Sequence, residues 1–452
     1  MRTTGIGDDV AVVRPAARLR GEPHLPGDKS ISHRALMLAL LARGESRIDD
    51  AGDGADVRST AGIVEALGAS VRRLGSGDGT VDYRIASPGA DALTQPSATL
   101  DCGNSGTSLR LFAGLLAGLP MTATLDGDES LRRRPVARII EPLRSMGAVL
   151  QARQDDSLPP VIVTGRSPLR AVDFVPAVPS AQVKSAVLLA ALRAEGTTTV
   201  REAVATRDHT ERMLRARGVA VRTEAGADRS VIISMEGGGR VQPIDEHVPA
   251  DVSAAAFWLV AAAIHPDAEL TLRGVGINPT RRAVIDLLRA MGADIEERPI
   301  EATAATEPAV GEPRADLVVR SSRLHGVELA PADVASAIDE IPVLCLAGAV
   351  ADGTTTIHAA GELRHKESDR IGGIAAGLSA LGADVEVDGD DITVHGNARL
   401  VGSLTDSCDD HRLAMTFAIA GLVATGETRV GRSASASISY PGFFAELERV
   451  RA

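Results

Sequence analysis

Aromatic residues are scarce in this chain of 452 residues, because phenylalanine, tyrosine and tryptophan together make up only 2%. Proteins that read single-stranded nucleic acid depend on aromatic side chains on which the bases stack, so this class of function is disfavoured. Hydrophobic residues nevertheless reach 44%. The core must therefore be built from Ala, Leu, Val and Ile, with Ala and Gly allowing close packing.

Cysteine is also rare. The three cysteines, Cys102, Cys345 and Cys408, are far apart in the sequence, and neither a zinc-binding spacing nor a disulfide framework is visible. No apolar run approaches about 18 residues without a charge, and no apolar segment follows Met1. We therefore expect a protein that is not exported, does not span a membrane and works in the cytoplasm.

Basic residues are outnumbered, with 48 Lys and Arg against 60 Asp and Glu, for a net charge of −12. This balance argues against a nucleic acid or another polyanion as partner. A small anionic substrate remains compatible with it, because a few clustered cations can set the local potential against the global one.

Repetition is the strongest positive signal. A small apolar helix followed by a short Thr-rich or β-branched strand recurs six times, at a spacing of about 75 residues. The predicted helices are 35–42, 109–118, 183–194, 254–264, 341–350 and 413–424. Between them recurs a Leu/Met-Gly-Ala motif, as at 67–69 and 146–148, whose glycine suits the left-handed end of a helix. Six units predict two domains of three units each.

Pro-bearing stretches at 22–26 and 242–249 mark the joints between these domains. We expect the chain to begin in one domain, to form the other and then to return. The first domain is therefore predicted to be discontinuous, with residues 1–26 plus 248–452, and the second to contain residues 27–247. The polar segment 301–314 is interpreted as a surface insertion.

Polar and charged side chains gather where the repeated helices begin. Ser, Asp and Asn at such positions are ordinary N-cap residues, and one such start alone would be structural. Caps do not require cations, yet cations are present: Lys29, Arg34, Arg110, Lys184 and Arg412. A helix N-terminus already favours an anion, so cations at several equivalent starts predict a site for phosphates and carboxylates. The alternative for each cation alone is a solvated surface charge.

Three Arg-rich stretches lie between the repeats, at 130–135, 207–212 and 362–370. Each alone is compatible with an exposed turn or a surface helix with salt bridges. Arginine is also the residue that grips a carboxylate or phosphate with two hydrogen bonds. Asp339 lies at the edge of the apolar run 341–350, and Glu367 lies among Lys366, Arg364 and Arg370. Carboxylates near such cations stay ionised or exchange protons with a bound substrate.

Together these stretches resemble the EPSP synthase family, the 3-phosphoshikimate 1-carboxyvinyltransferases. The matching stretches are PGDKSISHRAL (26–36), GNSGTSLR (103–110), GDESLRRRPV (127–136), SAQVKSAVLLA (180–190), RDHTERML (207–214), IDEIPVL (338–344), ELRHKESDRI (362–371) and DDHRLAMTFA (409–418). The resemblance implies an α/β fold, a two-domain inside-out α/β barrel. Each domain would have three βαβαββ repeats around a pseudo-threefold axis, with the active site in the cleft between the domains.

The resemblance also implies a reaction. The 5-hydroxyl of shikimate 3-phosphate attacks C2 of phosphoenolpyruvate while C3 is protonated, and a tetrahedral intermediate then loses phosphate on the way to chorismate and the aromatic amino acids. This chemistry needs a base, an acid and anion clamps, but neither a metal nor an organic cofactor. The expected partners are the two small-molecule substrates, and we expect a monomer.

Residue by residue, the resemblance implies three catalytic roles: Asp339 as the base for the 5-hydroxyl, Glu367 as the proton donor to C3, and Lys29 as a bridge between the substrates. It implies phosphoenolpyruvate contacts at Lys29, Gly106, Arg134, Gln182, Arg370 and Arg412. It implies shikimate 3-phosphate contacts at Lys29, Ser30, Arg34, Ser180, Ala181, Gln182, Arg207, Asp339 and Lys366.

The sequence departs from well-known members at Ile438, which lies in a motif where they carry a Lys that contacts phosphoenolpyruvate. Short motifs at 27–30, 180–184, 207–211 and 278–281 resemble the glyphosate-tolerant class, although Gly106 stands where some tolerant members carry Ala. The alternative function is UDP-N-acetylglucosamine enolpyruvyl transfer. Members of that family have Lys-Asn at the start of the first helix. They generally carry a Cys, or sometimes an Asp, on the loop before their Arg-Pro pair. Here the first helix has Lys29-Ser30, and 129–134 contains no Cys.

Overall fold

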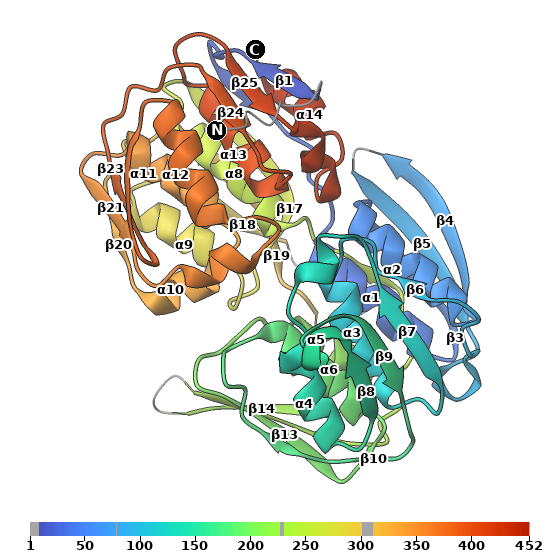
Figure 1. Cartoon of the computed structure of the whole chain (residues 1–452). Coiled ribbons are helices and arrows are strands. Elements are labelled where there is room, and N and C mark those ends of the chain that lie inside the picture. Colours follow the sequence, from blue (N-terminus) through green and yellow to red (C-terminus); the bar gives the residue numbers. More distant parts are fainter. Residues whose placement is uncertain (1–8, 78, 227–229, 301–310, 452) are drawn as a thin grey trace. The chain divides into compact units, whose positions relative to one another are not determined.

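The computed structural model describes residues 9–77, 79–226, 230–300 and 311–451. The chain divides into two compact units (Figure 1). Unit 1 contains the described residues of Met1–Pro26, Pro249–Glu301 and Pro313–Ala452, and unit 2 contains Gly27–Val248 with the described end of Ala302–Glu312. The predicted surface insertion at 301–314 lies largely outside the described residues.

Unit 2 repeats one arrangement three times, a four-stranded sheet in which a parallel pair is followed by two antiparallel neighbours. In order across each sheet, the strands are β16 (Glu246–His247), β3 (Gly44–Gly52), β5 (Thr80–Ser87) and β4 (Ser70–Gly77); β6 (Leu100–Asp101), β7 (Thr122–Asp126), β9 (Leu158–Thr164) and β8 (Val149–Ala152); and β11 (Asp173–Phe174), β13 (Thr197–Glu202), β15 (Val231–Glu236) and β14 (Val221–Ala225). A further short pair joins β10 (Leu169–Arg170) to β12 (Ala194–Glu195). Strand β16 comes from the end of the unit but pairs with β3 near its start, which closes the unit.

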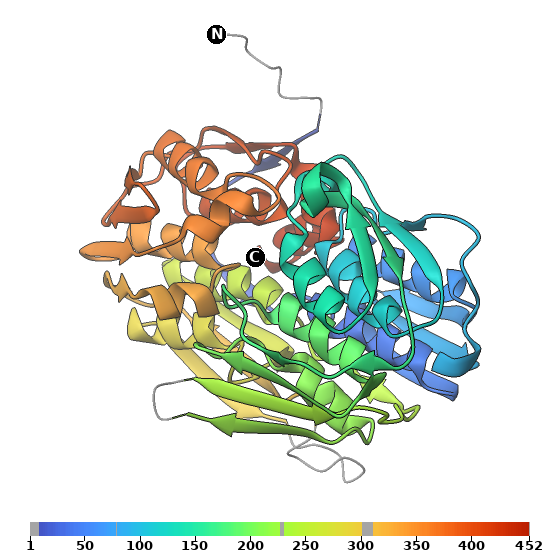
Figure 2. The ribbon, with the colours of Figure 1, turned by 60° about the horizontal axis from the view of Figure 1, so that its bottom comes forward.

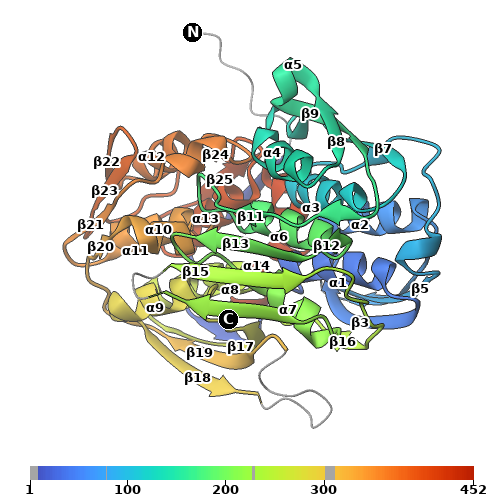
Figure 3. The same cartoon turned by 90° about the horizontal axis from the view of Figure 1, so that it is seen from below.

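Each sheet of unit 2 carries two main helices, which are α1 (Lys29–Leu41) and α2 (Ala55–Ala66), α3 (Gly106–Ala117) and α4 (Ala137–Ser145), and α6 (Ala181–Ala191) and α7 (His209–Ala216). A short helix, α5 (Arg153–Asp156), lies between β8 and β9. The first helix of each repeat is the apolar one predicted from the sequence, and these three helices lie side by side (Figure 2). Strands β13 and β15 run along the outer side of α6 (Figure 3).

Unit 1 repeats the same arrangement with one modification. Its sheets are β2 (Leu19–Gly21), β17 (Ala268–Gly276), β19 (Arg314–Arg320) and β18 (Asp294–Pro299); β20 (Glu328–Leu329), β21 (Thr354–Ile357), β23 (Asp391–His395) and β22 (Asp384–Asp388); and β24 (Leu404–Asp406), β25 (Thr428–Gly431) and β1 (Val10–Val13). The third sheet takes its last strand from the N-terminal end of the chain, where β1 pairs antiparallel with β25. The helices of the unit are α8 (Val252–Ile264), α9 (Ala283–Ala290), α10 (Pro331–Ser336), α11 (Ile341–Val350), α12 (Arg370–Ala380), α13 (His411–Gly421) and α14 (Phe443–Val450).

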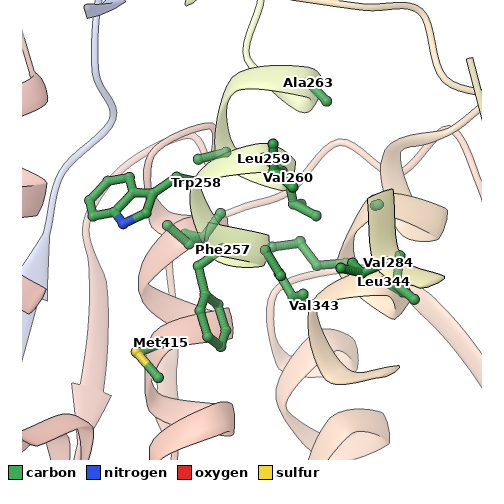
Figure 4. Packing of buried hydrophobic residues seen from close by; sticks show 14 of the residues in the cluster. Phe257, Trp258, Leu259, Val260, Ala263, Val284, Val343, Leu344 and Met415 are labelled. Atoms are coloured by element: carbon green, nitrogen blue, oxygen red, sulfur yellow. The ribbon is translucent and has the colours of Figure 1, made fainter. Parts of the chain in front are cut away.

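The centre of unit 1 is made by α8, α11 and α13. Helix α8 has no charged residue, and every position from Val252 to Ala263 is buried, as expected for a helix that is apolar on all sides. Phe257 of α8, Val343 of α11 and Met415 of α13 belong to one buried cluster (Figure 4). Within the described ranges, no helix is both long and apolar enough to cross a membrane.

Small residues allow the helices of unit 2 to approach closely, as the scarcity of aromatic residues predicts. A Cβ built on Gly114 of α3 would lie only 2.2 Å from the carbonyl oxygen of Ala186 in α6. Any side chain at position 114 would therefore push these helices apart.

The six predicted helices are confirmed, but five of them begin earlier than predicted. The reason is a side-chain cap further upstream: in α1 the Asp28 carboxylate accepts from Ile31 N at 2.9 Å, and in α3 the Ser105 hydroxyl accepts from Ser108 N at 3.0 Å. As a result, the cations noted at the helix starts lie inside the first two turns of the helices.

Candidate active site

Gln182 connects the first turns of α3 and α6 in unit 2. Its Nε2 donates to Thr107 Oγ1 at 3.0 Å, and its Oε1 accepts from Arg110 Nη1 at 2.6 Å. Ser180 is the N-cap of α6, so Ser180, Ala181 and Gln182 form the start of that helix. The structure therefore brings the predicted residues of α6 next to those of α3.

Arg34 connects α1 with the N-terminal parts of α6 and α7. It is 4% exposed, and it donates to the backbone oxygen of Ser30 at 2.8 Å, to Thr210 Oγ1 at 2.7 Å and to Ser185 Oγ at 2.9 Å. Burial lowers the pKa of Arg34 to about 10, against the opposing effect of Glu211. The guanidinium thus stays charged at neutral pH while its hydrogen bonds in the described part of the chain go to uncharged oxygens.

Gly106 opens α3 beside two arginines. A Cβ at this position would lie 2.9 Å from Arg110 Nη1 and 3.6 Å from Arg134 Nη1. Arg134 Nη2 in turn donates to Asn104 Oδ1 at 2.6 Å. Guanidinium groups therefore lie next to the N-terminus of α3, where free N–H groups and the helix dipole favour an anion.

Two further predicted residues of unit 2 also lie in this region. Lys29 is the first residue of α1, and its Nζ lies 3.2 Å from Asp56 Oδ2. Arg207 lies near enough to Arg34 to lower its pKa, after the larger effect of burial. The nine predicted residues that we call the unit 2 cluster are Lys29, Ser30, Arg34, Gly106, Arg134, Ser180, Ala181, Gln182 and Arg207.

The prediction that Lys184 belongs with the anion-binding cations is wrong. Its Nζ lies 2.8 Å from Glu202 Oε2 and 2.8 Å from Glu211 Oε1, and its side chain is 1% exposed. It also donates to the backbone oxygen of Thr206 at 3.2 Å. Lys184 is directed into the unit, where it forms ion pairs with two carboxylates and contacts Thr206, the residue before Arg207.

Arg370 is the centre of the predicted residues in unit 1. It is 1% exposed, and its Nε and Nη2 donate to Asp410 at 2.8 and 3.3 Å. Its Nη2 also donates to Glu367 Oε2 at 2.6 Å, and its Nη1 lies 3.5 Å from Asp339 Oδ1. One buried guanidinium therefore holds three carboxylates, two of which are the predicted acid and base.

Lys366 and Arg412 complete this group. Lys366 Nζ lies 3.3 Å from Asp339 Oδ1, and Arg412 Nη1 lies 3.5 Å from Glu340 Oε1. We call Asp339, Lys366, Glu367, Arg370 and Arg412 the unit 1 cluster. Burial alone would lower the pKa of Arg370, but Asp410, Glu367 and Asp339 outweigh burial and raise it. The cluster therefore combines fixed cations with carboxylates that can accept or donate protons.

Sequence reasoning missed two carboxylates here. Asp410 caps α13 by accepting from Arg412 N at 2.8 Å, and the same carboxylate holds Arg370. Glu340 is 1% exposed and pairs with Arg281. Its position directly before the apolar run 341–350 is the sequence signal that could have identified Glu340.

Ile438 lies at the end of a short 3-10 helix, Ser433–Ile438, and the loss of a phosphoenolpyruvate contact there stays a prediction.

The chain is similar to known proteins over nearly its whole length. The family described as EPSP synthase (3-phosphoshikimate 1-carboxyvinyltransferase) matches residues 13–447. A 3-phosphoshikimate 1-carboxyvinyltransferase from Gloeobacter violaceus is 49% identical over 440 residues, covering 97% of this chain and 98% of the relative. One from a Synechococcus species is 47% identical over 451 residues, covering 100% and 98%. The structure of EPSP synthase from Acinetobacter baumannii matches with a TM-score of 0.85 and 38% identity over 98% of both chains.

Proposed function

This chain belongs to the EPSP synthase family, and from that premise we propose that it transfers the enolpyruvyl group of phosphoenolpyruvate to the 5-hydroxyl of shikimate 3-phosphate and releases phosphate. The observation that carries the proposal at the level of residues is the unit 1 cluster, in which one buried arginine holds both Asp339 and Glu367. UDP-N-acetylglucosamine is not favoured as the acceptor, because the relatives bear the name of the shikimate 3-phosphate enzyme.

Asp339 has the surroundings that a base for the 5-hydroxyl needs. Lys366 at 3.3 Å and Arg370 at 3.5 Å both favour its ionised form, which is the form that accepts a proton. Glu367 acts as the proton donor to C3 of phosphoenolpyruvate. Because Arg370 also favours the ionised form of Glu367, this carboxylate has to take up a proton before each transfer. Its contact with Arg370 at 2.6 Å fixes the direction of the carboxyl group. The carboxylate left after that transfer is stabilised by the same guanidinium.

The unit 2 cluster supplies the anion contacts. Ser180, the backbone of Ala181 and Arg207 receive the phosphate of shikimate 3-phosphate, supported by Arg34. Gly106 and Arg134, with Gln182, receive phosphoenolpyruvate at the start of α3. Lys29 bridges the two substrates, and Arg370 and Arg412 are the remaining phosphoenolpyruvate contacts. That the enzyme acts as a cytoplasmic monomer stays a prediction.

Phosphate release from phosphoenolpyruvate tests the function. We expect release only when shikimate 3-phosphate is present, and none when UDP-N-acetylglucosamine replaces it. Asp339→Ala should lower kcat by at least about 100-fold, because a positioned general base contributes that much. It should leave calorimetric binding of shikimate 3-phosphate detectable.

Asp388→Ala is the matched control, since Asp388 is an exposed carboxylate at the end of β22. This variant should keep the wild-type kcat. Phosphate release that does not depend on the acceptor would contradict the proposed function. Unchanged turnover in Asp339→Ala would contradict only the role of Asp339 as the base.

A further inference from the structure

Glu340 is a buried carboxylate to which the proposed reaction gives no role. It directly follows Asp339 and is the N-cap of α11. Arg281 donates to it from both Nη atoms, to Oε2 at 2.8 Å and to Oε1 at 2.8 Å, and Ser253 donates its hydroxyl to Oε1. Burial would raise the pKa of Glu340, but Arg281 and Arg412 outweigh burial and lower it. The carboxylate is therefore ionised inside the protein.

The surrounding structure fixes Arg281 for this contact. The Asn278 side chain accepts from Thr280 N at 2.9 Å and from Thr280 Oγ1 at 2.8 Å, and the Asn278 backbone oxygen accepts from Arg281 N at 2.8 Å. Arg281 also donates to the Ser253 hydroxyl at the start of α8. The motif at 278–281 thus builds a turn whose last residue carries a fixed guanidinium, with 5% of its side chain exposed.

Arg412 is the other cation near Glu340, and its contact is much weaker. Its Nη1 lies 3.5 Å from Glu340 Oε1, beyond the usual length of a charge-assisted hydrogen bond. Arg412 Nε is buried and has no hydrogen-bond partner among the described residues, although the side chain is only 8% exposed. A buried guanidinium with an unused donor is prepared to receive an acceptor that the protein does not itself supply.

We propose that Arg281 is a positioning residue that occupies the Glu340 carboxylate and thereby leaves the guanidinium of Arg412 available to the anion of phosphoenolpyruvate. This inference rests on the proposed function, in which Arg412 is a phosphoenolpyruvate contact. It adds a specific cause for the availability of Arg412: the nearest carboxylate is already held by two hydrogen bonds from another arginine.

Competition between the two arginines follows from their geometry. Two parallel hydrogen bonds to one carboxylate are more favourable than a single contact at 3.5 Å, so Glu340 belongs to Arg281. Without Arg281, Glu340 would be a buried and uncompensated charge, which is strongly unfavourable. The nearest other cation is Arg412, and a small rotation of its side chain would form the missing pair. Arg412 would then be drawn away from the substrate.

Four proteins test this inference: the wild type, Arg281→Gln, Glu340→Gln, and the double variant. In Arg281→Gln we expect the KM for phosphoenolpyruvate to rise by at least about tenfold, the effect of losing a charged hydrogen bond. The KM for shikimate 3-phosphate should change less than about twofold, since Arg412 is not among the contacts expected for that substrate. In Glu340→Gln the competing charge is gone, so we expect the KM for phosphoenolpyruvate to stay at the wild-type value or fall.

The double variant decides between competition and a merely structural role. We expect its KM for phosphoenolpyruvate within about threefold of that of Glu340→Gln, because neither variant carries a charge that attracts Arg412. A further rise of tenfold or more on going from Glu340→Gln to the double variant would overturn the inference. This comparison holds even if Arg281→Gln does not fold. A wild-type protein without acceptor-dependent phosphate release would instead overturn the proposed function, before any variant is measured.

Discussion

Two buried arginines, one in each unit, have opposite surroundings. Arg34 in unit 2 is 4% exposed, and the hydrogen bonds that its side chain makes to described residues end on two hydroxyls and a backbone oxygen. Arg370 in unit 1 is 1% exposed and is held by Asp410, Glu367 and Asp339. Burial lowers the pKa of Arg34 to about 10, whereas the carboxylates around Arg370 outweigh burial and raise its pKa. Burial alone therefore does not determine the pKa of a buried arginine, because the neighbouring charges also contribute.

The contrast separates two kinds of chemistry. Around Arg370 the charges balance, with four cations and four carboxylates: Arg281, Lys366, Arg370 and Arg412 against Asp339, Glu340, Glu367 and Asp410. Such a group can move a proton between a carboxylate and a substrate without leaving a bare buried charge. Among the described residues the side chain of Arg34 donates to neutral oxygens, so an arriving phosphate would give it a charged hydrogen-bond acceptor. The surroundings of Arg370 thus suit proton transfer, and those of Arg34 suit the binding of an anion.

Arg370→Met is the variant in which we expect the largest loss of both stability and turnover. The substitution leaves Asp410 buried without its main cation, which we expect to lower the free energy of unfolding by about 3–5 kcal/mol. Turnover should also fall by at least about 100-fold, because Asp339 and Glu367 lose the group that orients them. Urea denaturation followed by circular dichroism measures the first effect, and phosphate release measures the second.

Arg323→Met is the control for Arg370→Met. Arg323 also forms an ion pair, with Asp352, but its side chain is 90% exposed. Its loss should therefore change the free energy of unfolding by less than about 1 kcal/mol. If both variants were equally stable, the carboxylates around Arg370 would contribute nothing to stability, and the two units would not differ in the proposed way.

Arg34→Met tests the buried arginine of unit 2, for which we expect a loss of substrate affinity and little loss of stability. Its neutral partners can turn toward other groups, so the free energy of unfolding without ligand should fall by no more than about 1 kcal/mol. The affinity for shikimate 3-phosphate should fall by about 1.5–3 kcal/mol, the value of a hydrogen bond to a charged group. Calorimetric titration measures this affinity. Arg34→Lys keeps the charge and should lose less affinity, whereas a stability loss in Arg34→Met as large as in Arg370→Met would remove the distinction.

The sequence predicted the fold better than it predicted the partners of each cation. The repeated apolar runs identified all six central helices, and Leu/Met-Gly-Ala identified helix ends, where Gly68 and Gly147 have φ of +101° and +104°. Both signals are local in the chain, so they are readable without the structure. The structure groups the predicted site residues into the unit 1 cluster and the unit 2 cluster, while their contacts with substrates stay predictions.

Lys184 shows why the partners were less predictable. Both it and Arg34 lie in the first two turns of a central helix, and both are buried. Only the fold determines that Glu202 and Glu211, from a strand and a different helix, form ion pairs with Lys184. The hydrogen bonds of the Arg34 side chain to described residues go instead to neutral oxygens. Glu340 was missed for a similar reason, since its partner Arg281 comes from a loop distant in the chain. Which charge is balanced depends on contacts that no local pattern contains.

The smallest effect that we predict is on the pH dependence of stability. It concerns two histidines, one in each unit, whose pKa values are shifted in opposite directions. His33 of α1 is fully buried, and its Nδ1 lies 2.6 Å from Thr60 Oγ1. Burial, and then Lys29 and Arg34, lower the pKa of His33 well below its ordinary value. His358 of unit 1 is partly exposed, and its hydrogen bonds to Asp391 and Glu328 raise its pKa.

These opposite shifts predict opposite contributions to the pH dependence of stability. Below pH of about 6.5 the unfolded chain protonates His33 and the folded chain does not. The unfolded state then binds more protons, so stability decreases as the pH is lowered. Between pH 7 and 5.5 this loss should be about 1 kcal/mol, and His33→Gln should abolish it in urea titrations at both pH values. His358 gains its pairing on protonation, so His358→Gln should leave the loss in place or increase it. If His33→Gln kept the full loss, burial together with Lys29 and Arg34 would not be what keeps His33 neutral in the folded chain.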